Sequence, residues 1–67
     1  MFFLSQDGLR LVESSHLYIS EGSIFAVVSG GDDIELAHYD VYGAAQEALR
    51  SVYAAIEDSE AVFSFAE

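Results

Sequence analysis

Apolar and polar residues alternate with a period of two through much of the first forty positions. Ile34 and Leu36 alternate with Asp33 and Glu35, which directs the apolar side chains to one face of a strand and the acids to the other. Short segments with strand character, separated by turns centred on glycine, occupy residues 9–13, 16–20, 24–28 and 33–37. The short connections favour hairpins. The pattern predicts an antiparallel meander of about four strands.

The period changes after Tyr39. Ala45, Leu49, Val52 and Ile56 recur at i, i+4, i+7 and i+11, which is the apolar stripe of an amphipathic helix. We expect this helix to span residues 41–57. Asp40 precedes it and is a candidate N-cap, because its side chain can accept hydrogen bonds from the first helical amides.

The chain closes with residues 61–65, where Phe63 and Phe65 share a face at strand spacing. This segment is either a short strand at a sheet edge or a tail docked on the domain or on a partner. The pattern as a whole predicts one α+β domain over residues 1–67. The expected core lies on the inward faces of the strands and helix, and it comprises Leu17, Ile19, Val28, Ile34, Leu36, Leu49, Val52 and Ile56.

Composition favours a folded chain. Hydrophobic residues make up 52% of the 67 positions, and cysteine is absent, so disulfides cannot supplement the small core. A homodimer interface would supply further apolar burial. The apolar residues 1–4 are not accompanied by the basic residues with which a signal peptide begins. No apolar segment is as long as a membrane span. We therefore expect a cytoplasmic protein with no membrane association.

Charge is the most informative property of the sequence. Twelve acidic residues oppose two arginines, giving a formal net charge of −10. Such a surface repels nucleic acid and anionic membranes and attracts basic protein surfaces. We therefore expect no direct nucleic-acid binding and a basic protein partner. The alternative is that the acidity only maintains solubility or reflects a saline environment.

Catalytic and cofactor chemistry finds little support. His16 begins one expected strand and His38 directly follows another, and neither belongs to a zinc-ligand motif, so we interpret them as surface residues. The paired acids at 32–33 and 57–58 lack the alternating spacing of a calcium loop. No glycine-rich loop carries the lysine that would hold a phosphate. The sequence thus predicts a protein that is not an enzyme and needs no cofactor or metal.

A resemblance adds a biological setting. Tyr39 and Asp40, the helix positions Ala45, Leu49 and Val52, and the aromatic C-terminal segment resemble small phage and mobile-element proteins built as a strand meander followed by one helix. In size and charge the chain is similar to anti-CRISPR proteins that mimic DNA. That resemblance implies a phage-type inhibitor acting on a CRISPR effector complex.

Mimicry of this kind requires carboxylates in a regular row. Same-face residues of a strand lie about 6.6 Å apart, which is comparable to the charge spacing of a nucleic-acid backbone, and Asp33 and Glu35 have this relation. The expected partner-binding residues are acids of the meander together with one outward tyrosine, namely Asp32, Asp33, Glu35, Glu13, Glu21 and Tyr18. The alternative is a self-associating structural or regulatory module that uses Tyr18 and the aromatic tail.

Overall fold

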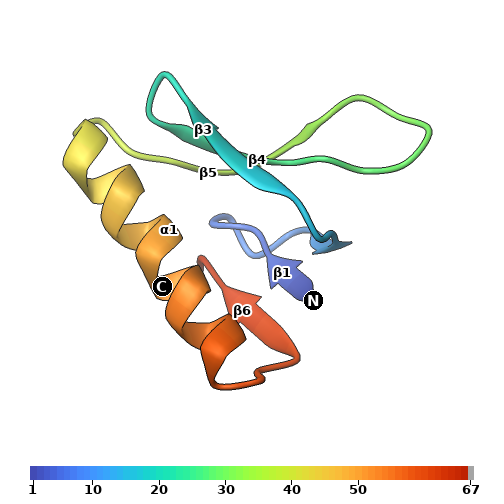
Figure 1. Cartoon of the computed structure of the whole chain (residues 1–67). Helices are drawn as coiled ribbons and strands as arrows, with labels where there is room; N and C mark the ends of the chain where they lie inside the picture. The colour runs from blue at the N-terminus through green and yellow to red at the C-terminus, as the bar shows by residue number, and fades with distance from the viewer. Residues whose placement is uncertain (67) are drawn as a thin grey trace.

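The computed structural model describes residues 1–66 as two small sheets flanked by one helix (Figure 1). The elements in chain order are β1 (Phe2–Leu4), β2 (Leu11–Glu13), β3 (Leu17–Ser20), β4 (Ser23–Ala26), β5 (Ile34–His38), α1 (Tyr42–Glu57) and β6 (Val62–Ser64). The predicted α+β class is confirmed, and so is a C-terminal strand. The single four-stranded meander is replaced by two three-stranded sheets.

The first sheet has the order β2-β1-β6. Strand β1 pairs antiparallel with β2 and parallel with β6. The sequence pattern missed β1, because three residues are too few to show a period. Phe3 at its centre is buried, and its ring stacks on Phe65 with centroids 6.2 Å apart. The C-terminal segment is therefore a sheet strand whose following aromatic residue belongs to the core.

The second sheet has the order β3-β4-β5 and is antiparallel throughout. Strands β3 and β4 join through Glu21 and Gly22, whose φ angles are 50° and 81°. Positive φ at both positions defines the two-residue turn that matches the twist of a hairpin. A Cβ on Gly22 would lie 2.5 Å from the backbone oxygen of Tyr39, so this position also requires glycine for space.

A bulge in β5 changes which side chains face outward. Phe25 pairs with Glu35 and Ile24 pairs with Ala37, so Leu36 is an extra residue. Both Leu36 and Ala37 are consequently buried. The following His38 returns to the outer face that carries Glu35. Simple alternation would have placed His38 on the inner face.

Short polar links join the two sheets. The amide of Gln6, just after β1, donates to the Leu36 carbonyl at 2.7 Å, and the Gln6 side-chain oxygen accepts from the His38 amide at 3.0 Å. Buried Ser14 donates to the Val27 carbonyl at 2.7 Å. Gln6 therefore covers the outer edge of β5, and β3 forms the other edge of this sheet.

Helix α1 begins one residue later than predicted and ends at the predicted Glu57, but its N-terminal cap differs from the expected one. Its N-cap is Val41, which makes no side-chain cap hydrogen bond, so the expected cap at Asp40 is wrong. At the C-terminus the Glu60 amide donates to the Ala55 carbonyl and the Ser59 amide to the Ile56 carbonyl. With Ser59 at φ 60°, these two bonds form a Schellman cap. The cap offsets the unfavourable interaction between the acidic residues near this end and the negative end of the helix dipole.

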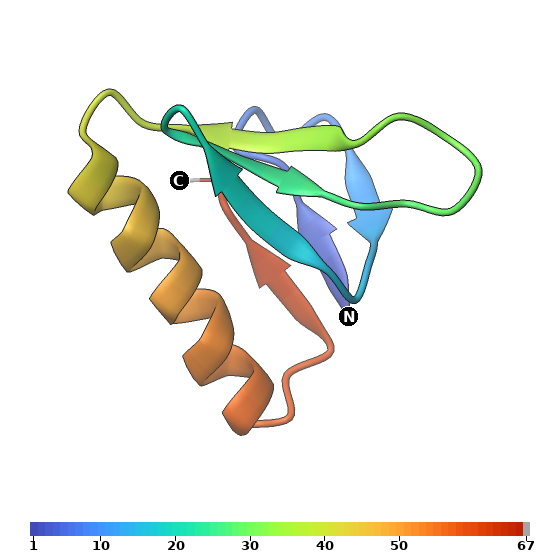
Figure 2. The same cartoon turned by 45° about the horizontal axis from the view of Figure 1, so that its top comes forward.

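The core lies between the sheets and the inner face of the helix. Its buried apolar residues are Phe3, Val12, Ile24, Ala26, Leu36, Ala37, Ala45, Val52 and Phe65. The expected core was right for Leu36 and Val52. Ile56 is 56% exposed, which corrects its assignment to the core. The other expected members are half-buried, and Leu17, Ile19, Val28 and Ile34 pack against the edge of the core. Figure 2 shows the helix running alongside the two sheets.

Candidate functional site

The outer face of the second sheet carries a row of aromatic and acidic side chains. Tyr18, Phe25 and Glu35 are direct neighbours across β3, β4 and β5. The Tyr18 and Phe25 rings stack at 5.5 Å, and the loop before β5 adds Asp33. We call the surface formed by Tyr18, Phe25, Asp33 and Glu35 the acidic–aromatic face.

One hydrogen bond fixes the edge of this face. The Tyr18 hydroxyl donates to Oδ2 of Asp33 at 2.5 Å. This bond, followed by desolvation and the negative charge of Asp33, raises the pKa of Tyr18 above its ordinary value. The hydroxyl also limits the motion of the Asp33 side chain. The result is a carboxylate held in place on the sheet surface.

Glu35 is also restrained by a hydrogen bond from a hydroxyl, in this case that of Ser23 on β4. Its Oε2 accepts from Oγ of Ser23 at 2.5 Å, and the same Oγ lies 2.8 Å from Nδ1 of His38. Nε2 of His38 in turn lies 3.6 Å from Oδ1 of Asp40. The β5 bulge brings these groups together by placing His38 outward. A four-residue polar chain thus runs from Glu35 to the start of the helix.

This chain contains a serine, a histidine and an aspartate, but its hydrogen bonds do not suit nucleophilic catalysis. Ser23 has a single hydroxyl proton, and in this arrangement it donates that proton to Glu35 rather than to Nδ1 of His38. A general base would have to accept that proton instead. Ser23 is also only 6% exposed. The arrangement therefore serves to position Glu35 and to join β4 with β5.

The remaining predicted site residues lie apart from one another. Asp32 is exposed in the loop and precedes Asp33 in the sequence. Glu21 lies in the β3–β4 turn, at the opposite end of the hairpin from Asp33. Glu13 belongs to the first sheet and pairs with the N-terminal ammonium of Met1 at 3.7 Å. The structure gathers Tyr18, Asp33 and Glu35, and Asp32 is the sequence neighbour of Asp33 in the loop, whereas Glu13 and Glu21 are separate.

Phe25 is the member of this face that sequence reasoning missed. Residues 24–28 are apolar without interruption, which indicates a central strand but does not show that its outward residue would contact Tyr18. The contact could have been predicted only from the pairing register of β3 and β4, because the two-residue turn at 21–22 aligns Tyr18 with Phe25.

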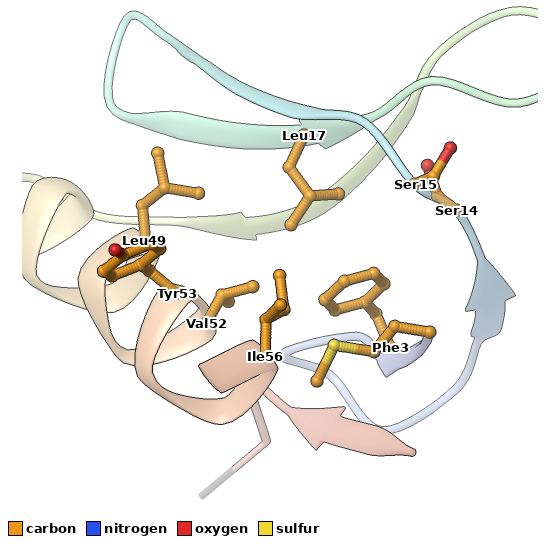
Figure 3. A pocket seen from close by; sticks show the side chains of 9 residues that line it. Phe3, Ser14, Ser15, Leu17, Leu49, Val52, Tyr53 and Ile56 are labelled. Carbon is orange, nitrogen blue, oxygen red and sulfur yellow. The ribbon is translucent and has the colours of Figure 1, made fainter. Parts of the chain in front are cut away.

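An apolar groove lies between β3 and α1. One cavity of about 520 Å³ lies between Leu17 of β3, Phe3 of β1, and Val52 and Ile56 of the helix (Figure 3), and Met1 also lines it. A second of about 620 Å³ continues along β3 toward Ile19 and Tyr42. Leu17, Leu49 and Tyr53 line both. We call this continuous surface the β3–α1 groove.

Comparisons with known proteins leave the site to be interpreted from its geometry: no protein-family model, curated protein or solved structure matches the chain. Within residues 1–66, no helix is long and apolar enough to cross a membrane. The same residues contain no group of three His, Asp or Glu side chains arranged to hold a metal ion.

Proposed function

We propose that this chain is a non-enzymatic inhibitor whose acidic–aromatic face occupies a basic nucleic-acid-binding site on a host protein complex. The observation that carries the proposal is the restraint of two carboxylates, Asp33 and Glu35, by the hydroxyls of Tyr18 and Ser23. A restrained carboxylate loses less conformational entropy on docking than a mobile one. It therefore presents fixed negative charge to a basic surface.

Net charge and aromatic content support the same assignment. The formal charge of −10 steers the chain toward a positive channel and away from nucleic acid itself. The stacked rings of Tyr18 and Phe25 offer a flat surface beside the carboxylates, as bases lie beside phosphates in a nucleic acid. A CRISPR effector complex in the host cytoplasm is the partner that the resemblance in size and charge favours.

Charge reversal tests this proposal. Wild-type protein immobilised at low salt should capture a nucleic-acid-binding protein from a bacterial lysate, identified by mass spectrometry. The double variant Asp32→Lys/Asp33→Lys should lose that capture while remaining folded, and its melting temperature should fall no further than that of Tyr18→Phe, which removes the same Tyr18–Asp33 bond. Capture of the partner should also weaken steeply as salt is raised.

A matched reversal at the helix end provides the control. Glu57→Lys/Asp58→Lys changes the net charge by the same amount at the opposite part of the molecule, and it should retain capture. Loss of capture in this variant alone would place the binding surface on the helix. Binding that neither reversal nor salt affects would contradict a charge-driven mechanism.

A self-associating module is the second candidate function. It is favoured by the exposed apolar side chains of α1, where Tyr42, Tyr53 and Ile56 are each more than half exposed. The aromatic tail no longer contributes to this alternative, because Phe65 is buried in the core. Self-association through these residues would persist at high salt, and sedimentation equilibrium at two ionic strengths distinguishes it from charge-driven capture.

A further inference from the structure

The edge of β3 that faces α1 has unpaired backbone groups. Ser20 and Ser23 flank the two-residue turn and form a hydrogen-bonded pair, and His16 accepts from the Val27 amide at 2.9 Å. Because bonded and non-bonded pairs alternate along an antiparallel ladder, the backbone groups of Leu17 and Ile19 point away from β4. Within residues 1–66, β3 has no second strand neighbour.

This edge borders the β3–α1 groove. The side chains of Leu17 and Ile19 line the groove together with Leu49 and Tyr53 of the helix. An extended segment placed beside β3 would therefore bond to the edge and direct alternate side chains into an apolar channel. Main-chain bonds with pockets for every second side chain are the characteristics of strand addition.

Charge decides the occupant. A second copy of this chain would bring two net charges of −10 together, and like charges oppose association. Arg50, the one basic residue that lines the groove, already pairs with Glu47 at 3.2 Å. A basic segment is instead attracted by the net charge of the chain.

We propose that the β3–α1 groove binds an extended basic segment of the partner by strand addition to β3, with apolar residues at alternate positions entering the groove. The segment's positive charge rests on the proposed function, whereas its extended conformation follows from the edge and the groove alone. The groove lies along a free strand edge and the acidic–aromatic face lies on the outer surface of the same sheet, so one basic partner would contact both.

A defined peptide tests the inference on the wild-type protein. The probe is a capped heptapeptide alternating lysine and valine, with a block peptide of the same composition as its control. Titration followed by NMR should shift the amide signals of Leu17 and Ile19 and slow their hydrogen exchange with the alternating peptide only. Shifts confined to the acidic–aromatic face, or equal shifts with both peptides, would overturn the proposal.

Backbone methylation of the peptide supplies a sharper test. In a strand, alternate amides point to opposite edges, so only one set can bond to β3. N-methylation of either the valine set or the lysine set should reduce affinity roughly tenfold or more, and methylation of the other set should leave it unchanged. Equal effects from both sets would rule out strand addition.

Protein variants separate the edge from the groove. Ile19→Pro removes an outward amide without breaking a ladder bond, and Ile19→Ala is its control for the lost side chain.

Tyr53→Ala opens the groove wall, with Leu11→Ala as the control because Leu11 is exposed on β2 outside the groove. We expect Ile19→Pro and Tyr53→Ala to weaken peptide binding beyond their controls. Should Ile19→Pro fail to fold, the methylated peptides still test bonding to the β3 edge, and Tyr53→Ala still tests the groove.

Two further outcomes distinguish this inference from the proposed function. If the peptide binds at β3 while charge reversal at Asp32 and Asp33 leaves partner capture unchanged, the groove proposal stands and the acidic face does not. If the protein instead forms dimers that protect the Leu17 and Ile19 amides, a second copy occupies the groove and the inference is overturned.

Discussion

The hydroxyl of Tyr18 donates a hydrogen bond to the carboxylate of Asp33 across fifteen positions of sequence. Tyr18 lies on β3 and Asp33 in the loop before β5, so the bond spans the sheet at its open end. It restrains a surface charge and holds the tyrosine ring on Phe25 at the same time. This pair connects the fold of the sheet to the proposed binding face.

The Tyr18–Asp33 bond predicts a loss of stability at alkaline pH. Hydrogen bonding to Asp33, with desolvation and the Asp33 charge, raises the pKa of Tyr18 in the folded state. The stabilisation is therefore complete below the ordinary tyrosine pKa of about 10 and is lost as pH rises through the higher folded value. Melting temperatures measured from about pH 8 to about pH 11.5 should fall further for wild type than for Tyr18→Phe. Parallel profiles for the two proteins would mean that the bond contributes nothing.

A pair of glycine substitutions tests the packing around the β3–β4 turn. Gly22 and Gly30 have similar φ angles of 81° and 75°, but only at Gly22 would a Cβ meet the Tyr39 carbonyl, at 2.5 Å. Gly30→Ala should cost about 1 kcal/mol from backbone strain alone. Gly22→Ala should cost about 1–3 kcal/mol more, since the turn and the Tyr39 backbone must separate. Urea denaturation measures both, and equal costs would contradict the close approach.

The position of the helix predicts unequal costs for two apolar truncations. Leu36 is buried in the β5 bulge, whereas Ile56 is 56% exposed beside the groove. Leu36→Ala should lower the free energy of unfolding by about 2–5 kcal/mol. Ile56→Ala should lower it by less than about 1 kcal/mol. A comparable loss at Ile56 would show that the helix packs more closely in solution.

Sequence patterning predicted the parts of the fold that depend on local order. The helix over Tyr42–Glu57 follows from an apolar stripe that continues over about three turns, and the β3–β5 meander follows from alternation between glycine turns. Strand β1 was missed because its three residues are too few to show a period, and its pairing with β6 at the far end of the chain leaves no local signal. The exposure of Ile56 was also missed, because periodicity identifies an apolar face without showing how much of it a neighbour covers.

Local alternation also predicted part of the candidate site. Outward placement of Asp33 and Glu35 follows from the burial of Ile34 and Leu36 on the alternating strand. The cluster of Ser23, Glu35 and His38 depends on a bulge, which inserts one residue and leaves no clear sign in hydrophobic alternation. Glu13 and Glu21 share the charge of the site residues but lie elsewhere, since charge alone carries no information about position.

Displacement of nucleic acid measures the central claim most directly. A fluorescently labelled oligonucleotide is bound to the captured partner, with a guide-loaded CRISPR effector complex as the first partner to be examined, and its anisotropy is followed as this protein is added. Wild type and Glu57→Lys/Asp58→Lys should release the oligonucleotide in a salt-sensitive manner, and Asp32→Lys/Asp33→Lys should not. Partner binding that leaves the oligonucleotide in place, or equal release by all three proteins, would contradict the assignment of the acidic–aromatic face as a nucleic-acid mimic.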